Sequence, residues 1–417
     1  MSVRKDHQLS VPPGEYLERI LDVARRSAIS DTLSLPLQES FGHVLAQDVF
    51  AGTDIPSFAN SAMDGFAVLG SDLRGEDVTL QVVGDQPAGS ARALSIQAGQ
   101  AVRIMTGAPL PKGADTVVQS EITEDHGSAV TVASSARPCA NVRMPGEDVQ
   151  AGKKVLSRGM RLSAQRISAA AACGESSLLV YQVPKVGVIS TGDELAEPGQ
   201  TLKEGPPLKL GQIFESNSYM LAALVEKFGA NARRYRASSD LSEDLAGALD
   251  KAALENDVIL LSGGVSVGKY DVVRNLLDGS SGAWFTRVAI QPGKPQGIAE
   301  WKNTPVLAFP GNPVGSFVSF YLFGKPFIKT IAREVLSPTL YVPARAGADW
   351  KCPKDRRQYT PVSIEMEENG SLIATPTNAR GSGSHLVTSL ASAQALAVVE
   401  PGKDKVQMGQ AVKVMWI

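Results

Sequence analysis

The sequence predicts a multidomain α/β protein with a central, mostly parallel sheet, two small mainly β domains and a helical linking layer. Strand-like runs alternate with helix-like runs between Lys185 and Phe323, which is typical of a parallel sheet covered by helices. Short alternating runs broken by Gly, Pro and Asp lie on both sides of this stretch and predict the two β domains. The length of 417 residues corresponds to about three domains rather than one, at roughly 150 residues each.

Two helices flank the first β domain and predict a helical linking region made of residues 1–50 and 150–182. Glu15–Arg26 places apolar residues at helical spacing. An alanine-rich helix is expected at Ala164–Ala172, with Ser163 as its N-cap.

Residues 51–149 are expected to form the first small β domain, and residues 335–417 the second. Both contain short runs that alternate apolar and polar residues, as half-buried strands do. The expected strands of the first are Val78–Val83, Ala101–Ile104, Thr116–Gln119 and Ala129–Val132. Those of the second are Tyr359–Ile364, Ser371–Ala374, Ala395–Val399 and Ala411–Met415.

Residues 183–334 carry the alternating pattern of the α/β domain. Strands are expected at Val186–Ser190, Ala232–Arg236, Val258–Leu261, Thr286–Ile290 and Val306–Phe309. Helices are expected at Tyr219–Phe228, Leu241–Leu254, Val272–Leu277 and Val314–Phe323. Ser218 and Asp240 stand at N-cap positions, and Gly229 at a C-terminal position.

Composition and charge exclude several classes of protein. With 41 Lys and Arg against 43 Asp and Glu, the net charge of −2 provides no overall basic field for nucleic acid or an anionic membrane. Cys139, Cys173 and Cys352 are far apart, which argues against a disulfide framework and a cysteine zinc site. The four histidines are scattered and predict no metal cluster.

The sequence also indicates where the protein works. Residues 1–14 are polar and lack the apolar core of a secretory signal. The segment 303–324 carries no charge and is long enough to cross a membrane. Several Pro and Gly residues interrupt it, however, and they fit a strand, a loop and a helix better than a membrane span. We therefore expect a cytoplasmic protein with neither nucleic acid nor membrane as a partner.

Glycine-rich loops follow the strands of the expected α/β sheet. Ligands of such sheets bind outside the carboxyl ends of the strands, so these loops should open on one edge. Glycine allows backbone N–H groups to approach a phosphate-like oxyanion closely. For any single loop, a tight turn is the alternative. The candidate binding residues are Gly192, Ser262, Gly263, Gly264, Ser266, Gly268, Lys294, Pro310, Gly311, Asn312 and Pro313.

Several carboxylates stand in or beside these loops. Glu194 and Asp193 either cap a turn or hold Mg²⁺ against phosphate oxygens. Asp240 is better explained as a helix cap, whereas capping and metal binding are equally open for Asp271.

The first β domain carries polar loop residues of its own. Asp64 lies in a loop of small residues, Thr106 follows a strand, and Asp148 lies in an acidic turn. Taken singly, each is explained as a turn residue. Spacing does not place these loops beside the α/β sheet, and no spaced Ser, His and Asp or Cys and His set supports nucleophilic catalysis.

Five motifs occur in order along the chain. They are SAMDG at 61–65, RIMTGAP at 103–109, STGDEL at 190–195, SGGVSVG at 262–268 and PGNPV at 310–314. Together they resemble the molybdopterin molybdenumtransferase family, called MoeA in bacteria and represented by the gephyrin E domain in animals. The resemblance implies a four-domain homodimer whose helical region takes part in dimerisation. Its active site would lie between the molybdopterin-binding α/β domain of one subunit and the first β domain of the other.

The activity implied by the resemblance is insertion of molybdenum from molybdate into adenylylated molybdopterin, with Mg²⁺-dependent release of AMP. An adenylyltransferase and molybdoenzyme clients are the implied protein partners. The matching functional positions are Asp64, Thr106, Asp148, Glu194, Asp240, Asp271, Pro310, Pro313 and Ser384, the last in a Gly-Ser-His motif that helps bind molybdate. Our hypothesis is that Glu194, with Asp148 or Asp271, holds Mg²⁺, and that Asp64 and Thr106 position the substrate.

The chain departs from the family pattern at cationic positions. Two lysines that the family usually carries appear as Arg287 and Gln291, although Lys294 remains nearby. Pro361 falls where one alignment places an arginine of the C-terminal domain, and Arg357 and Arg380 are alternative counterparts. From these departures we expect an altered affinity for oxyanions. Two alternatives to the molybdenum-inserting enzyme therefore stay open, which are a non-catalytic cofactor-binding scaffold and a tungstate-preferring paralogue. A third reading is an adenylyltransferase, against which the flanking β domains argue.

Overall fold

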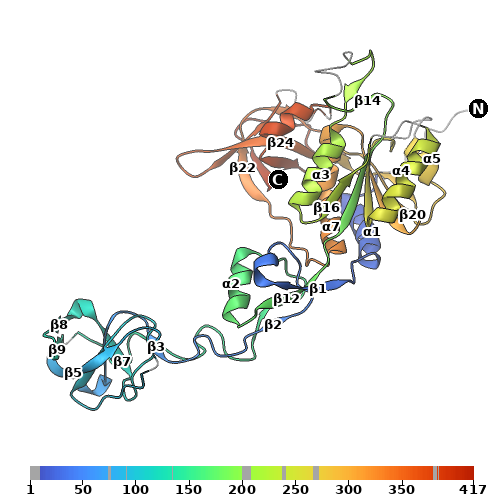
Figure 1. The fold of residues 1–417 in the computed structure, drawn as a ribbon. Helices are drawn as coiled ribbons and strands as arrows, with labels where there is room; N and C mark the ends of the chain where they lie inside the picture. The colour runs from blue at the N-terminus through green and yellow to red at the C-terminus, as the bar shows by residue number, and fades with distance from the viewer. Residues whose placement is uncertain are drawn as a thin grey trace, which may run out of the picture. The chain divides into compact units, whose positions relative to one another are not determined.

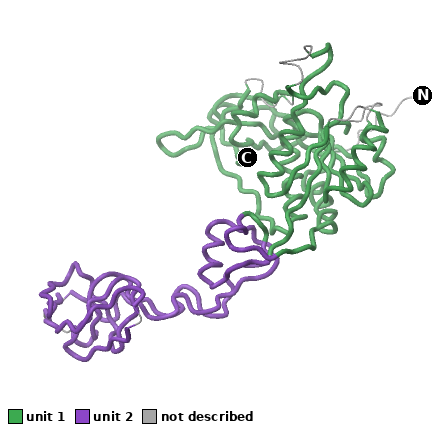
Figure 2. Tube along the Cα trace, viewed as in Figure 1, with its two compact units in different colours: residues 1–33, 42–44, 180–417 green, residues 34–41, 45–179 purple. Residues whose placement is uncertain are grey.

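The computed structural model describes residues 10–73, 77–90, 92–133, 135–199, 208–236, 241–265, 272–378, 383 and 385–417. The chain divides into two compact units (Figure 2). Unit 1 contains residues 1–33, 42–44 and 180–417, and unit 2 contains residues 34–41 and 45–179. In the described part of the chain, no helix has both the length and the apolar character needed to cross a membrane.

A six-stranded sheet forms the centre of unit 1 (Figure 1). Its strands, in spatial order, are β16 (Asn231–Arg234), β13 (Lys185–Ser190), β17 (Val258–Ser262), β21 (Thr304–Phe309), β20 (Pro295–Trp301) and β18 (Trp284–Arg287). The first four run parallel, whereas β20 is antiparallel to both of its neighbours. The expected α/β fold with a mostly parallel sheet is therefore confirmed.

Helices cover both faces of this sheet, and the strands divide their side chains between two cores. Val186 and Val188 of β13 pack in one core with α1, α3, α6 and α7, whereas Ile189 packs in the other with α4 and α5. Alternate burial on two faces explains why β17 is a continuous apolar run. The helices are α1 (Pro13–Arg26), α3 (Asn217–Lys227), α4 (Ser242–Glu255), α5 (Val272–Leu277), α6 (Pro313–Ser319) and α7 (Lys325–Ile331).

The N-terminal helix α1 belongs to unit 1. Its Tyr16 is fully buried, with its ring centroid 5.3 Å from that of Trp284 and 4.8 Å from that of Phe323. After α1, the chain continues into β1 (Thr32–Pro36), which pairs with β12 (Ser177–Tyr181).

Three details of unit 1 differ from the prediction. β20 was not expected, because Pro and Gly are uncommon in strands and occur at Pro295 and Gly297. A Cβ on Gly297 would lie 2.4 Å from the Phe285 ring, so close packing requires glycine there. The helix expected to end at Phe323 continues through a π-helical turn, η4 (Phe320–Gly324), into α7. Ser216 rather than Ser218 is the N-cap of α3, while Asp240 lies outside the described residues.

A closed barrel forms the C-terminal part of unit 1. Its strands pair in the order β24, β25, β22, β28, β26 and back to β24. These strands are β22 (Val342–Ala346), β24 (Arg357–Met366), β25 (Leu372–Pro376), β26 (Ala395–Val399) and β28 (Ala411–Trp416), with a small pair of β23 (Trp350–Lys351) and β27 (Lys405–Val406) beside them. A short strand from the α/β part, β19 (Ile290–Gln291), pairs in parallel with the start of β24. The four strands expected here are present, and β22 is an addition.

Unit 2 contains a six-stranded sheet of its own. Its strands, in spatial order, are β7 (Thr116–Gln119), β4 (Gly65–Val68), β6 (Gln100–Ile104), β5 (Val78–Gln86), β9 (Ala129–Val132) and β8 (Thr123–Asp125). Smaller pairs join β3 (Asn60–Ser61) to β10 (Val142–Arg143) and β2 (Val49–Phe50) to β11 (Lys154–Leu156), and the helix α2 spans Ala164–Ala172 as expected. The central strand β4 was not expected. It begins at Gly65, where a Cβ would lie only 1.9 Å from the carbonyl oxygen of Val118.

Candidate functional site

The loops predicted to bind phosphate-like groups lie at one edge of the α/β sheet. Ser190 pairs with Ser262, and Ser262 pairs with Phe309, so β13, β17 and β21 end at the same level. Arg287 at the end of β18 pairs with Pro295 at the start of β20, which brings the loop 288–294 to that edge as well. Parallel strands place the loops that follow them on one side of the sheet.

Two of these loops touch through their glycines. The N–H of Thr191 donates to the Ser262 carbonyl at 3.0 Å, and that of Gly263 donates to the Phe309 carbonyl at 3.1 Å. Gly263 has φ +112°, and a Cβ there would lie 2.5 Å from the Thr191 carbonyl oxygen; a Cβ on Gly311 would contact the Cα of Gly263 at 3.4 Å. Glycine is therefore required for the close approach of these backbones. Ser266, Gly268 and Asp271 lie outside the described residues.

Asn217, which the sequence reasoning missed, connects two of the loops. Its amide nitrogen donates to Ser262 Oγ at 2.9 Å and to the Gly311 carbonyl at 2.6 Å. Its Oδ1 is buried and has no hydrogen-bond partner among the described residues. The only sequence signal was its place in the polar segment 215–217 at the start of a helix, which is also explained by capping.

Asn312 and Pro313 complete the PGNP loop at the start of α6. Asn312 is the N-cap residue of that helix, and its side chain makes no capping hydrogen bond. Pro313 occupies the first turn, where proline is tolerated because the first N–H groups have no intrahelical partner. The loop therefore leads directly into a buried helix, and Pro310 accepts a hydrogen bond from Ser262 Oγ at 3.3 Å.

Glu194 lies in the loop after β13 with an exposed side chain. Gly192 lies beneath this side chain, because a Cβ on Gly192 would be 2.5 Å from Glu194 Oε2. The backbone of Glu194 is held by the N–H of Ile213, which donates to its carbonyl at 2.8 Å. The carboxylate is thus presented at the edge of the sheet on an ordered backbone.

A second carboxylate at this edge, Glu215, is only 2% exposed. Ser190 Oγ and the N–H of Ser218 each donate to its Oε1 at 2.8 Å, and Ser218 Oγ donates to its Oε2 at 2.6 Å. The Arg234 guanidinium lies 3.4 Å from Oε2. These donors satisfy the carboxylate, so Glu215 supports the end of β13 rather than facing a ligand.

The PGKP loop carries Lys294 on a hairpin that is fastened to α6. The fully buried Gln296 donates through Nε2 to the Gly293 carbonyl and to Ser319 Oγ, both at 2.6 Å. Ser319 Oγ in turn donates to the Gly315 carbonyl at 2.8 Å. Burial, and then the positive charges of Arg356 and Arg287, lower the pKa of Lys294.

In unit 2, the structure brings together Asp64 and Thr106, which are 42 residues apart. The Thr106 N–H and Oγ1 donate to Asp64 Oδ1 at 2.7 and 2.8 Å. These two hydrogen bonds, the backbone one first, lower the pKa of Asp64. Asp148 is exposed in a different turn, where its N–H donates to the Ile55 carbonyl at 3.0 Å.

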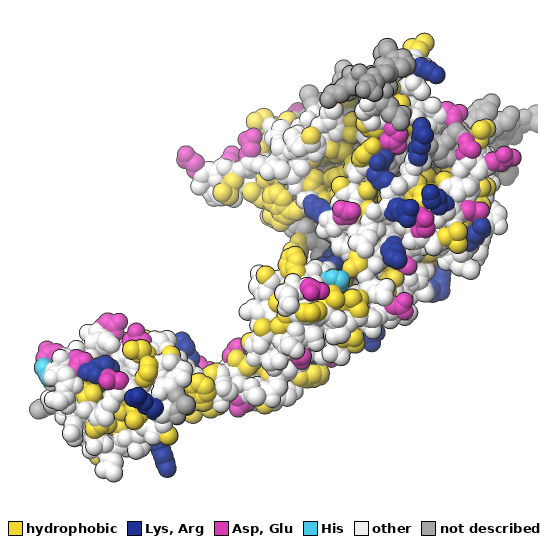
Figure 3. All heavy atoms as spheres, viewed as in Figure 1, with side chains coloured by type: hydrophobic (Ala, Val, Ile, Leu, Met, Phe, Trp, Pro, Cys, Tyr) yellow, Lys and Arg dark blue, Asp and Glu magenta, His cyan; other side chains and the backbone are white. Residues whose placement is uncertain are grey.

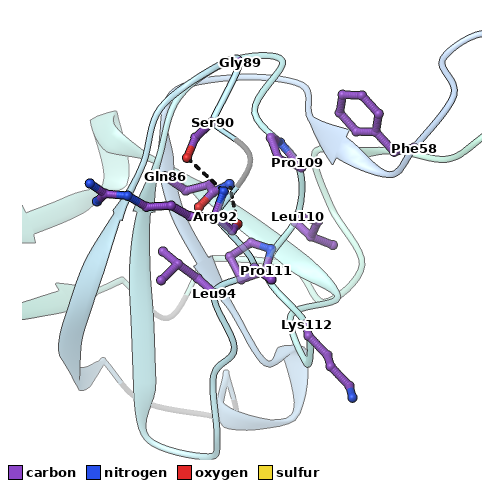
Figure 4. A pocket seen from close by; sticks show the side chains of 11 residues that line it. Phe58, Gln86, Gly89, Ser90, Arg92, Leu94, Pro109, Leu110, Pro111 and Lys112 are labelled. Carbon is purple, nitrogen blue, oxygen red and sulfur yellow. Dashed lines mark hydrogen bonds between the residues drawn. The ribbon is translucent and has the colours of Figure 1, made fainter.

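A hollow of about 580 Å³ in unit 2 is lined by residues that include Gln86, Pro109 and Lys112 (Figure 4). Gln86 accepts a backbone hydrogen bond from the N–H of Met105, the residue before Thr106. Its walls are largely apolar, and the side chains of Arg92 and Lys112 point away from one another (Figure 4). The two cationic side chains of the described lining therefore do not converge on one point.

The donor set at the sheet edge fits Mg²⁺ in one respect. Proteins commonly hold Mg²⁺ through one or two carboxylates while substrate phosphates supply further oxygens, and Glu194 is an exposed carboxylate beside loops of the phosphate-binding type. No group of three or more His, Cys, Asp or Glu is placed to hold a metal among the described residues. Among the described residues of this edge, Glu194 is thus an exposed carboxylate that suits such an ion, with the remaining oxygens coming from elsewhere.

The last predicted site residue is Ser384, which lies outside the described residues. Its neighbours Gly383 and Leu386 form a turn, in which the Leu386 N–H donates to the Gly383 carbonyl at 3.2 Å.

On the face seen in Figure 3, basic and acidic side chains are interspersed rather than gathered into a single basic surface.

Comparison with known proteins matches three family models to the chain. Residues 11–174 match the MoeA N-terminal region (domain I and II), residues 187–330 a probable molybdopterin binding domain, and residues 343–417 the MoeA C-terminal region (domain IV). Molybdopterin molybdenumtransferase 2 from Mycobacterium tuberculosis is 38% identical over 395 residues, covering 92% of this chain and 94% of that protein. The chain belongs to the molybdopterin molybdenumtransferase (MoeA) family.

Further relatives agree with this assignment. Molybdopterin molybdenumtransferase from Haemophilus influenzae is 32% identical, covering 92% of this chain and 94% of that protein. The crystal structure of the molybdopterin biosynthesis moeA protein from Pyrococcus horikoshii OT3 has a TM-score of 0.81 at 30% sequence identity, covering 98% of this chain and 100% of that one. The family resemblance inferred from the five motifs is confirmed.

Proposed function

We propose that this protein is a transferase of molybdenum cofactor biosynthesis, which inserts molybdenum from molybdate into adenylylated molybdopterin and releases AMP. The observation that carries the proposal is its full-length similarity to proteins named molybdopterin molybdenumtransferase. The edge of the α/β sheet supplies the chemistry that this reaction needs. The close-packed glycine loops lack side-chain bulk and so allow phosphate oxygens to approach the backbone, and Lys294 and Arg287 offer positive charge.

In this proposal, Glu194 binds Mg²⁺ together with Asp148 or Asp271. When bound, the ion would neutralise negative charge on the phosphoanhydride that is cleaved to release AMP. Asn217 holds the loops after β17 and β21 in one arrangement, so that the phosphate-binding backbone is preformed. Asp240 is included as a further acid of the proposed site, because Leu241 is the N-cap residue of α4.

The proposal includes a homodimer. The α/β domain of one subunit would face the first β domain of the other, where the Asp64 and Thr106 pair positions the substrate. It also includes the four-part division into 1–50 with 150–182, 51–149, 183–334 and 335–417, and a cytoplasmic location. An adenylyltransferase would supply the substrate, and molybdoenzymes would receive the product.

The test is a reconstitution with purified protein, adenylylated molybdopterin, molybdate and Mg²⁺. We expect release of AMP and a metal-loaded cofactor, whereas a scaffold would bind the cofactor without releasing AMP. An adenylyltransferase would instead consume ATP with the unadenylylated cofactor. Repeating the assay with tungstate identifies a tungstate-preferring enzyme by faster release of AMP.

Glu194→Ala tests the assigned metal ligand within the same assay. We expect AMP release to be lost while the fold and the dimer, followed by circular dichroism and light scattering, are unchanged. Glu226→Ala removes an exposed carboxylate from α3 and serves as the matched control. Unchanged AMP release by Glu194→Ala at limiting Mg²⁺ would rule out its role.

A further inference from the structure

The hollow of about 580 Å³ in unit 2 has the size and the walls of a binding site, and the proposed reaction does not use it. Ligand sites in proteins commonly measure about 300–1,000 Å³ and are mostly apolar. The apolar lining here comes from Phe58, Leu94, Leu110, Pro109 and Pro111. Phe58 is exposed, and Leu94 and Leu110 are half-buried. Apolar surface is therefore open to a ligand at this place.

One polar side chain of the lining has an unsatisfied hydrogen-bonding atom. Gln86 is only 1% exposed, and its Nε2 donates to the Arg92 carbonyl at 3.3 Å. Its Oε1 is buried and has no hydrogen-bond partner among the described residues. A buried acceptor without a donor costs free energy, which a bound N–H or O–H group can recover. The lining thus favours a ligand that combines apolar surface with a hydrogen-bond donor.

Two cations lie on different sides of the hollow. Arg92 and Lys112 are both exposed, and their side chains point away from one another (Figure 4). Arg103 of the same unit pairs with Asp85 and Asp125, whereas Arg92 and Lys112 have no ion-pair partner in the described part of unit 2. Diverging cations do not share one compact anion. They match an extended ligand that carries acidic groups on both sides of its apolar part.

The main chain of the lining already makes hydrogen bonds of its own. The N–H of Leu110 donates to the Ala59 carbonyl at 2.9 Å, and that of Lys112 donates to the Leu94 carbonyl at 2.8 Å. The two prolines of this segment have no N–H to donate. Pairing of an added β-strand along it is therefore disfavoured, and recognition depends on side chains.

We propose that this hollow docks an acidic segment of a partner protein, with an aromatic side chain of that segment seated in the hollow. An indole or phenol side chain supplies both the apolar surface and a donor for Gln86 Oε1. Glutamate or aspartate residues on both sides of the aromatic residue pair with Arg92 and Lys112. The inference goes beyond the proposed reaction, because none of the lining residues belongs to the proposed catalytic set.

Fluorescence anisotropy tests the docking on the full-length protein with a fluorescein-labelled heptapeptide. The peptide has a central tryptophan, one leucine on each side of it and two glutamates at each end. We expect saturable binding that weakens about tenfold or more in Phe58→Ala, because this variant removes apolar surface from the wall. The matched control is Phe41→Ala, which removes another exposed phenylalanine of unit 2 outside the lining. Its affinity should stay within about twofold of the wild-type value.

Charge reversal distinguishes recognition from a structural role of the two cations. The double variant with Arg92→Glu and Lys112→Glu should lose the acidic peptide and bind a peptide that has lysines in place of the glutamates. Arg137→Glu reverses an exposed charge of unit 2 outside this lining and should not change the peptide preference. Loss of both peptides by the double variant, with an unchanged circular dichroism spectrum, would overturn the inference.

Four further results would also overturn it. The first is the absence of saturable binding up to about 1 mM peptide. The second is equal binding of a peptide with serines in place of its tryptophan and leucines, which shows charge attraction alone. The third is equally tight binding of N-acetyltryptophan, which assigns the hollow to a small molecule. The fourth is a smaller particle in light scattering of Phe58→Ala, which assigns this face to a second copy of the chain. The amount of AMP released by the wild type bears on the proposed function alone.

Discussion

Gln296→Leu tests whether the buried amide fastens the PGKP hairpin to α6. Leucine has a similar volume but removes both hydrogen bonds of Nε2, to the Gly293 carbonyl and to Ser319 Oγ, each 2.6 Å long. Ser319 keeps its bond to the Gly315 carbonyl, so the main loss is an unsatisfied carbonyl at Gly293. Such a loss costs about 1–3 kcal/mol.

One effect acts in the opposite direction. The Oε1 atom of Gln296 is buried without a partner among the described residues, so its removal recovers part of the cost. We therefore expect a net destabilisation of about 1–2 kcal/mol, together with weaker oxyanion binding because Lys294 is carried by the same hairpin.

Tryptophan fluorescence during urea unfolding measures this change selectively. The protein has four tryptophans, and all of them (Trp284, Trp301, Trp350 and Trp416) belong to unit 1. The control is Gln407→Leu, an exposed position in the barrel, where a change within about 0.5 kcal/mol is expected. If Gln296→Leu unfolds at the same urea concentration as the control, the amide does not stabilise the hairpin and this reasoning is refuted.

Two further predictions concern single polar groups. Thr106→Val should raise the pKa of Asp64 only part of the way to its ordinary value, because the stronger backbone hydrogen bond remains. A carboxyl NMR titration measures this rise, and its absence would contradict the assignment of the cause. Since the folded pKa is lowered, stabilisation by Asp64 is present at neutral pH and is lost as the pH falls through that value. Tyr16→Phe should leave stability unchanged or raise it, because the buried Tyr16 hydroxyl has no partner among the described residues; a clear loss in the fluorescence assay would show that this hydroxyl is bonded.

The sequence predicted the fold class because hydrophobic periodicity is a local property. β13, β17 and β21 are apolar runs that stay recognisable without their neighbours, and α5 was predicted at its observed bounds. The convergence of the loops after these strands followed from a general rule on parallel sheets, with no need for contact information. The five motifs then carried the family assignment.

Elements with weak local signals were missed. β4 and β20 begin at Gly65 and Pro295, and their central places between two other strands become visible only through pairing. Gly65 and Gly297 lie where a carbonyl oxygen and an aromatic ring from other strands approach too closely for a Cβ atom, so glycine is required at both positions. Such requirements lie in the partner segments and leave no periodic pattern in the strand itself.

The sequence by itself determined where strand-like and helix-like segments alternate, which loops are rich in glycine and which acidic residues lie near those loops in the sequence. Only the tertiary structure decided that Asn217 joins Ser262 to Gly311, that Asp64 meets Thr106, and that Glu215 is satisfied internally while Glu194 is exposed. It also decided that Arg357 is paired with Glu400. The physical reason is that a hydrogen bond or charge pair depends on strand register and side-chain distance, which join residues tens of positions apart and are invisible to spacing along the chain.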